Sequence, residues 1–282
     1  MNARLIMVYL TALVVYLCVA AADTIRYKPV SRETVEARLG RYTGNDQRRE
    51  QTLKQMFAEA GCDGQQVSEQ TVKGSKLPNV ICVLRGSSDK IIIVGAHFDH
   101  VPEGDGVVDN WSGASLLPSL YEALKSERRS HSYVFVGFTD EEKGEVGSRF
   151  YAHAMTREQV QATDAMVNLD TLGLAPSAIW ESHSDKRLTT MFFYLASQLG
   201  FKAQAINVER VGSTDSEQFA ARKIASITVH SLTQQAFDRR AIHSYNDKLS
   251  SIQRGDYYNT FRLLSVYLAY LDGLSPAHSP TH

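Results

Sequence analysis

Four segments of this chain are apolar along almost their whole length, and they constrain the fold more than any other feature. They are KIIIVGAH (90–97), SYVFVGFT (132–139), DAMVNLDT (164–171) and IASITVHS (224–231). A strand with one face in water alternates apolar and polar residues, so runs of this kind must be covered on both faces of a sheet. Helical patterns fall between and after them, at 111–126, 146–153, 188–199 and 255–271. This alternation predicts an α/β fold with three layers, αβα, around a mixed and mostly parallel central sheet.

The residues before the first of these strands predict two helices and a hairpin. Helical patterns occupy 31–40 and 46–60. The segment QQVSEQTV (65–72) then alternates polar and apolar residues, KGSKLP supplies a turn, and NVICVL (79–84) returns. We therefore expect an antiparallel pair of strands ahead of the parallel part of the sheet.

Residues 1–22 have the layout of a secretory signal peptide. Arg4 lies near the start, residues 5–19 are almost wholly apolar, and residues 20–22 are small. We therefore expect a secreted or periplasmic protein whose single domain comprises residues 23–274, followed by a disordered tail at 275–282. An N-terminal membrane anchor is the alternative, because the apolar run is long.

Export would change the meaning of the cysteines. Once Cys18 is removed with the signal peptide, Cys62 and Cys82 remain, an even number in an oxidising compartment. They flank the expected hairpin, and we predict that they form a disulfide. Two unpaired buried thiols are the alternative.

The charge of the chain argues against two classes of partner. The formal net charge is -1 and the isoelectric point is near 6.8. A nucleic-acid-binding protein or one that adheres to an anionic membrane carries a basic surface, and this balance predicts none. We expect no nucleic-acid partner, and no stable membrane contact once the signal peptide is cleaved.

Polar side chains with metal-binding groups follow each central strand. His97 and Asp99 end the first, Glu141 and Glu142 follow the second, and Asp170 follows the third. Ligands in open α/β sheets bind at the carboxyl ends of the strands. Taken singly, such residues are ordinary hydrogen-bonded or solvated groups. Gathered at one edge, they would repel one another unless a cation held them.

Two further candidates, Asp109 and His243, lie on loops. Together with His97, Glu142 and Asp170 they would make two imidazoles and three carboxylates without a cysteine. That set suits zinc or a related first-row ion better than calcium, which prefers oxygen ligands. Five ligands exceed what one tetrahedral zinc with an open position needs. They suit two ions about 3.5 to 4 Å apart that share one carboxylate, which leaves Glu141 free to act as a base.

The same residues carry a resemblance to a known family. Five segments in this order resemble the di-zinc aminopeptidases, the twenty-eighth metallopeptidase family: GAHFDH, GVVDNWSGAS, TDEEKGEVGS, NLDTLG and IHSYND. The resemblance spans about residues 94–247. Its relatives include leucyl and aminoacyl aminopeptidases and, more distantly, glutaminyl cyclases. It implies the zinc-dependent exopeptidase fold.

The resemblance also implies roles for individual residues. His97 and Asp170 would bind one zinc, Glu142 and His243 a second, and Asp109 would bridge them, with Glu141 as general base and Asp99 orienting His97. A ligating imidazole needs a partner for its other nitrogen, which agrees with the role of Asp99. A cis peptide bond between Asp109 and Asn110 is a further expectation.

Three other residues are candidates for contacts to the substrate or behind the ligands. Some family members carry a tyrosine near the last histidine, and here Tyr245 is close in sequence whereas Ile242 precedes the histidine. His100 is expected to face the cleft or to contact a ligand from behind. Asp215, in GSTDSEQF, would support the site or cap a helix.

The resemblance implies a two-zinc aminopeptidase that hydrolyses peptides with a free N-terminus by a metal-activated water. One alternative is a glutaminyl cyclase, which uses the same fold with one zinc. It is disfavoured because all five ligand positions and both glutamates are present. The other alternative is a non-catalytic binding domain, which would be expected to have lost ligands.

Overall fold

The computed structural model describes residues 25–209 and 212–274. The predicted signal peptide at 1–22 and the predicted tail at 275–282 lie outside these residues. Within the described ranges, the helices are too short or too polar to cross a membrane.

The centre of the structure is one eight-stranded sheet. Its strands are β1 Val67–Gln70, β2 Asn79–Leu84, β3 Ile91–His97, β4 Ser132–Phe138, β5 Thr163–Leu169, β6 Ala178–Ile179, β7 Gln204–Ala205 and β8 Ser226–His230. Their order is β1-β2-β4-β3-β5-β8-β6-β7. The four central strands β4, β3, β5 and β8 run parallel, while β1 with β2, β2 with β4, and β6 with β8 are antiparallel. The predicted mixed, mostly parallel sheet is confirmed.

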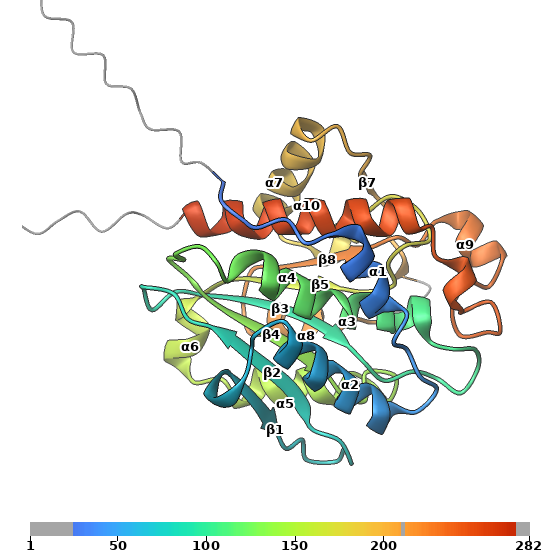
Figure 1. The fold of residues 1–282 in the computed structure, drawn as a ribbon, viewed down its shortest axis with the longest axis horizontal. Coiled ribbons are helices and arrows are strands. Elements are labelled where there is room, and N and C mark those ends of the chain that lie inside the picture. The colour runs from blue at the N-terminus through green and yellow to red at the C-terminus, as the bar shows by residue number, and fades with distance from the viewer. Residues whose placement is uncertain (1–24, 210–211, 275–282) are drawn as a thin grey trace, which may run out of the picture.

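Helices cover both faces of this sheet (Figure 1). One face is covered by α1 Arg32–Leu39, α2 Asp46–Glu59, α3 Ser112–Ala114, α4 Leu116–Leu124, α7 Lys186–Gln198 and α10 Arg254–Gly273. The other face is covered by α5 Val146–Ala154, α6 Arg157–Ala162 and α8 Ser216–Ala220. The helix α9 Gln234–Asp238 packs into a small separate cluster of apolar residues. The three-layer arrangement agrees with the prediction.

Strand β3 shows why its sequence is apolar throughout. Ile92 and Val94 pack into the larger core on one face, whereas Ile93 packs into the core on the other. Successive side chains of a strand point to opposite faces, so both sets must be apolar when both faces are covered. The unbroken apolar run therefore follows directly from burial on two sides.

Several elements differ from the sequence prediction. The expected helix at 111–126 forms as α3 and α4, and it follows a turn, Val107–Trp111, in which Asp109 and Asn110 have non-helical dihedral angles. Short elements were not predicted: α6, α8, α9 and the two-residue strands β6 and β7. Elements of two to six residues carry too little periodicity to stand out in a sequence.

Cys62 and Cys82 form a disulfide, as predicted. Both residues are fully buried, and the bond joins the segment after α2 to the middle of β2. Disulfides persist in oxidising compartments, so the bond is typical of an extracellular protein.

Removing this disulfide should destabilise the fold. The two cysteines are 20 residues apart, and closing a loop of that size stabilises a protein by about 3 kcal/mol through the unfolded chain. We expect the variant Cys62→Ala/Cys82→Ala to lose about that much free energy of unfolding in urea. Wild-type protein unfolded with a reductant is the control and should approach the variant. A loss within error of zero would contradict the prediction.

Candidate metal centre

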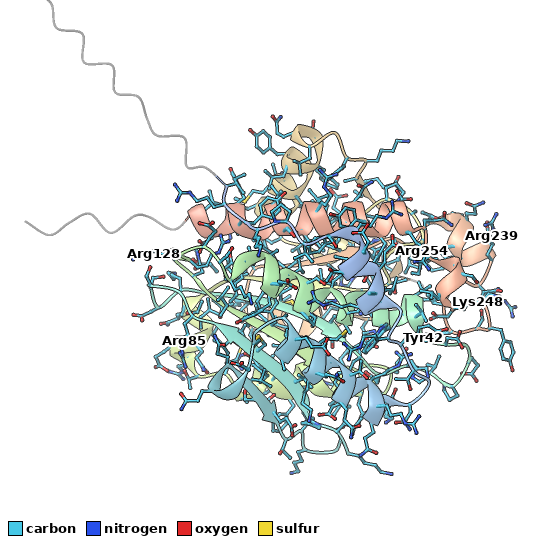
Figure 2. The ribbon with its side chains drawn as sticks, viewed as in Figure 1. Tyr42, Arg85, Arg128, Arg239, Lys248 and Arg254 are labelled. Carbon is cyan, nitrogen blue, oxygen red and sulfur yellow. A yellow bond between two sulfur atoms is a disulfide. The ribbon has the colours of Figure 1, made fainter. Side chains whose placement is uncertain are left out.

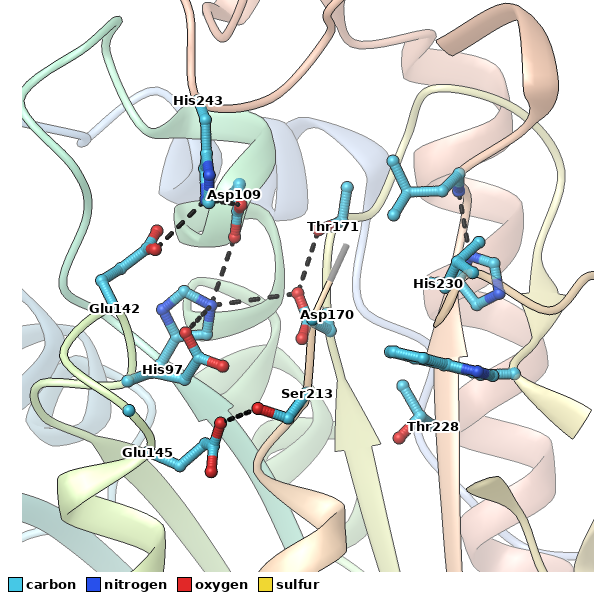
Figure 3. A pocket seen from close by; sticks show the side chains of 16 residues that line it. His97, Asp109, Glu142, Glu145, Asp170, Thr171, Ser213, Thr228, His230 and His243 are labelled. Atoms are coloured by element: carbon cyan, nitrogen blue, oxygen red, sulfur yellow. Dashed lines mark hydrogen bonds and ion pairs between the residues drawn. The ribbon is translucent and has the colours of Figure 1, made fainter. Parts of the chain in front are cut away.

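Three of the parallel strands deliver polar side chains to one edge of the sheet. His97 is the last residue of β3, Asp170 comes directly after β5, and Glu141 and Glu142 follow β4 in the turn before α5. Because β3, β4 and β5 are parallel neighbours, their carboxyl ends coincide. The predicted strand-end residues are therefore brought together, and Figure 3 shows His97, Glu142 and Asp170 facing one cavity.

Asp109 lies between the two histidines. One carboxylate oxygen, Oδ1, is 3.2 Å from Nε2 of His97, and the other, Oδ2, is 3.1 Å from Nε2 of His243. The peptide bond from Asp109 to Asn110 is cis, as the resemblance implied. A carboxylate that offers one oxygen to each of two imidazoles has the geometry required of a bridging ligand.

The remaining candidate ligands divide around this carboxylate. Glu142 Oε2 lies 3.1 Å from Nε2 of His243, and Asp170 Oδ1 lies 3.9 Å from Nε2 of His97. Two groups of side chains therefore share Asp109, in the pairing that the resemblance implied. The dashed lines in Figure 3 follow these contacts.

Glu141 faces the same cluster of side chains but lies farther from His97 than Asp109 does. Its Oε2 atom is 3.9 Å from Nε2 of His97. Burial raises the pKa of the Glu141 carboxyl to about 10, with His97 opposing the rise and Asp215, Asp170 and Asp109 adding to it. With these neighbours the Glu141 carboxyl group holds its proton near pH 7, and it can serve as a base only when positive charge is brought next to it.

Asp99 contacts both His97 and the turn after β4. Nδ1 of His97 lies 3.2 Å from the backbone oxygen of Asp99 and 3.6 Å from its carboxylate. The carboxylate also accepts the backbone N–H groups of Glu141 and Glu142, at 3.0 and 3.2 Å. Two amide donors from one turn hold both carboxylate oxygens, so Asp99 positions the turn that carries the two glutamates.

The histidines and carboxylates of this site shift one another's pKa values. Hydrogen bonds to Asp109 and then Glu142 raise the pKa of His243 to about 10. Burial alone would lower the pKa of His97, but the carboxylates around it, Glu141 first, raise it well above its ordinary value. The pKa of Asp109 falls because its contacts to the two histidines outweigh its burial. In this arrangement protons on the histidines supply the positive charge that the carboxylates demand.

The same site fits a metal ion. The Oε1 atom of Glu142 is buried and has no hydrogen-bond partner, which is costly for a carboxylate unless a cation contacts it. His97, Asp109 and Glu142 place ligand atoms within 4.8 Å of one another, and so do His97, Glu141 and Asp170. Nitrogen and oxygen donors in this combination suit zinc.

Several supporting residues were not singled out from the sequence. Asn110 donates to the backbone oxygen of Leu169 at 2.8 Å and accepts from the backbone of Thr171 at 3.2 Å, which ties the Asp109 loop to the Asp170 loop. Thr214 donates to the carboxylate of Asp170 at 2.8 Å. Asn110 lies in the segment GVVDNWSGAS and Thr214 in GSTDSEQF, but neither segment shows which groups these two side chains bind.

Asp247 is another such residue, and it holds Asp109 from the side of the His243 loop. Its carboxylate accepts the backbone N–H groups of Val108 at 2.6 Å and of Asp109 at 3.1 Å. Burial raises the pKa of Asp247 to about 7, with Asp109 adding to the rise and the backbone donors opposing it. Two loops that carry candidate ligands are therefore fastened to each other.

The three residues with uncertain roles have different surroundings. Tyr245 is 85% exposed. His100 faces Asp46 on α2, with Nδ1 2.7 Å from the Asp46 carboxylate, rather than the cleft. Asp215 is fully buried at the start of α8 without capping it through its side chain, and burial raises its pKa to about 7.

The cavity beside the candidate ligands has a volume of about 230 Å³. Glu145 and Ser213 line it below His97 and are hydrogen bonded to each other (Figure 3). Beyond Asp170, as Figure 3 shows, it is lined by Thr228 and His230. Burial lowers the pKa of His230 to about 4, so its ring is neutral near pH 7.

Strained backbone gathers at this cavity. Glu145, Thr171 and His243 all line it and have positive φ values of 50°, 55° and 50°. Left-handed conformations are uncommon outside glycine and concentrate at functional sites. The cavity therefore has this mark of a functional site in addition to its chemistry.

Comparison with known proteins identifies a family. Peptidase family M28 matches residues 79–268, a span that includes all five candidate ligands. Aminopeptidase YwaD of Bacillus subtilis is 30% identical over 124 residues, which are 44% of this chain and 25% of that protein. Leucine aminopeptidase 2 of Trichophyton rubrum is 31% identical over 96 residues, 34% of this chain and 19% of that protein. The match thus spans about a quarter or less of these curated relatives.

Solved structures share the fold. The LapA aminopeptidase of Legionella pneumophila superposes with a TM-score of 0.70 at 18% identity, covering 85% of this chain and 70% of that chain. A glutaminyl cyclase of Porphyromonas gingivalis superposes with a TM-score of 0.66 at 18% identity, covering 85% of this chain and 96% of that one. These likenesses confirm the predicted fold class.

Zinc should stabilise the protein. Each ion that binds the folded chain at 100 times its dissociation constant adds about 2.7 kcal/mol to the free energy of unfolding. We expect chelator-treated protein to melt at a higher temperature when zinc is restored. Calcium at the same concentration should have a smaller effect, because one of the two unshared donors on each side of Asp109 is an imidazole and calcium prefers oxygen ligands. An unchanged melting temperature with zinc would contradict the assignment of a metal centre.

Proposed function

The chain belongs to Peptidase family M28, and on that premise we propose that it is a secreted two-zinc aminopeptidase that removes N-terminal residues from peptides. The observation that carries the proposal is the placement of Asp109 between His97 and His243, with 3.2 and 3.1 Å to the two imidazoles. Glu142 and Asp170 complete one set of donors on each side. The curated relatives whose names state an activity are aminopeptidases, which supports the same reaction.

The proposal assigns one zinc to His97 and Asp170 and the other to Glu142 and His243, with Asp109 shared between them. Bound zinc would polarise the scissile carbonyl group and lower the pKa of the attacking water. The surrounding protein excludes bulk solvent from four of these side chains, since His97, Asp109, Glu142 and Asp170 are at most 16% exposed. His243 is 46% exposed and forms the open side of the site.

Glu141 is the proposed general base. Its carboxylate would take the proton of the attacking water and give it to the nitrogen of the departing amine. Positive charge nearby favours the ionised form of a carboxyl group, so a loaded site lowers the pKa of Glu141 from the value near 10 in the metal-free chain. Asp99 holds the backbone of Glu141 at 3.0 Å and so sets the direction of the base.

Cyclisation of an N-terminal glutamine is a second candidate. One observation favours it: the superposition covers 96% of the Porphyromonas gingivalis glutaminyl cyclase but 70% of the LapA aminopeptidase. Both reactions need a polarised carbonyl group and an acid–base carboxylate. They differ in the nucleophile, which is water in hydrolysis and the substrate's own amine in cyclisation, so the products separate the two.

Replacing the proposed base should separate catalysis from metal binding. We expect Glu141→Gln to lower kcat by about 10² to 10⁴-fold, the range for loss of a general base, with an unchanged zinc content by elemental analysis. Glu103→Gln, at an exposed residue of the loop after β3, is the matched control and should keep wild-type kcat. Glu141→Gln with near-wild-type activity and bound zinc would rule out this assignment.

A substrate panel tests the reaction itself. We expect zinc-loaded protein to release aniline from aminoacyl anilides with a free amine and to spare their N-acetylated counterparts. Neutral side chains should be preferred over lysine and glutamate, because neutral His230 lines the cavity with Trp180 and Leu232. Ammonia release from glutaminyl peptides without hydrolysis would establish the cyclase instead. Cleavage from free C-termini alone would exclude both.

A further inference from the structure

Arg49 of α2 is buried completely, which is unusual for a guanidinium group. Other arginines of this chain, such as Arg85, Arg128 and Arg239, project outward (Figure 2). The cost of removing a charged group from water must be offset by the contacts that it makes inside the protein. Arg49 makes these contacts next to the candidate metal centre.

Its hydrogen bonds reach backbone oxygens. Nε donates to Thr43 at 2.6 Å, and Nη1 donates to Phe98 at 3.2 Å and to Gly106 at 3.0 Å. Nη2 donates to the backbone oxygen of Asp105. Phe98, Asp105 and Gly106 belong to the loop that leaves His97 and arrives at Asp109. One side chain therefore joins the start and the end of the loop between a terminal ligand and the bridging ligand.

The loop is also packed closely against α2. A Cβ atom on Gly106, whose φ is +57°, would lie 2.8 Å from Nη2 of Arg49 and 2.4 Å from Cβ of His100. His100, three residues after His97, is held by Asp46 one turn before Arg49 on the same helix. The helix α2 thus provides two anchors, a guanidinium fork and a carboxylate, for a loop without regular structure of its own until Val107.

The geometry of the fork matters more than its charge. The guanidinium group has five N–H donors in a fixed plane, whereas lysine offers three donors from one atom. Lysine cannot reach carbonyl groups on Thr43, Phe98 and Gly106 at once, so buried oxygens in the loop would lose their donors. The loop would then relax, and with it the position of the Asp109 carboxylate.

We propose that Arg49 is a positioning residue of the metal centre, which fixes the loop 98–106 on α2, with help from the Asp46–His100 contact, and thereby holds Asp109 where two metal ions can share it. This inference rests on the proposed metal centre. It assigns Arg49 no contact with substrate or metal. Its effect is expected in metal affinity first and in turnover as a consequence.

The test compares two buried arginines on adjacent helices. Arg38 of α1 is 7% exposed and donates to Ser119 at 3.0 Å and Glu122 at 2.6 Å, both on α4. Arg49→Lys and Arg38→Lys both keep the positive charge and both remove a buried fork. Only Arg49→Lys disturbs the loop, so Arg38→Lys controls for a general loss of stability.

Zinc affinity is measured by competition with a chromogenic chelator, alongside urea unfolding and the zinc dependence of kcat and KM. We expect Arg49→Lys to bind zinc about 10 to 100-fold more weakly, the range for groups that orient ligands, while Arg38→Lys stays within about twofold of wild type. Excess zinc should restore kcat of Arg49→Lys. Unchanged zinc affinity in Arg49→Lys, or equal weakening in both variants, would overturn the proposal.

A second variant decides the matter if Arg49→Lys does not fold. His100→Gln removes the other anchor of the same loop, the contact of His100 with the Asp46 carboxylate, and leaves Arg49 in place. Weaker zinc binding would support the role of α2, whereas unchanged binding would overturn it. Wild-type protein keeps this test apart from the proposed function. Wild type that binds no zinc defeats the metal centre, whereas wild type that binds zinc but hydrolyses no substrate defeats only the proposed reaction.

Discussion

The carboxylate of Asp109 faces two imidazoles, one oxygen to each, and much of the structure around it serves to keep it there. The position of a carboxylate depends on the backbone that carries it, and three side chains hold the backbone around Asp109. Asp247 binds the backbone N–H of Asp109 from the His243 loop, Asn110 binds the Asp170 loop, and Arg49 binds the preceding loop to α2. Each holder comes from a different part of the chain, so the position of Asp109 depends on the whole tertiary fold.

The sheet and the loops make different contributions to this site. Parallel strands β3, β4 and β5 bring His97, the two glutamates and Asp170 to one edge. There Asp99 holds the turn that carries the glutamates, and Thr171, next to Asp170, has a positive φ. Asp109 and His243 come from loops, and His243 has a positive φ. A residue held in that conformation costs about 1–3 kcal/mol and persists where the surroundings enforce it. The sheet therefore positions the strand-end residues. The loops position Asp109, the shared ligand, and His243, the ligand on the open side.

The sequence alone was sufficient to predict the strand-end residues of this site. His97, Glu141 and Asp170 could be predicted because a buried strand shows as an apolar run and its end marks the functional edge. Asp109 and His243 stood out in the sequence only as polar residues on loops, and the resemblance supplied their roles, since loops have no periodicity that locates them in space. Arg49 gave no signal, because it binds backbone oxygens, and a backbone oxygen looks the same at every position of a sequence. Asp247 lies in the segment IHSYND, but nothing in that segment shows that it binds backbone N–H groups of the Asp109 loop. His100 was expected at the cleft for lack of any sign that Asp46, more than fifty residues earlier, would face it.

Protons and metal ions compete for the same atoms at this site. Hydrogen bonds to Asp109 and Glu142 raise the pKa of His243 to about 10, and burial raises the pKa of Glu141 to about 10, so both groups hold protons at neutral pH unless a cation displaces them. Zinc binds the neutral imidazole and the ionised carboxylate, which means that loading the site must expel those protons. The free energy of metal binding is therefore reduced by the cost of deprotonation, and more so at acidic pH. The crowding of carboxylates offsets that cost, because the Coulomb attraction of Asp109, Glu142 and Asp170 for an ion grows with the charge of that ion. The acidic surroundings that raise the pKa values of His97 and His243 are thus the same surroundings that favour a divalent cation.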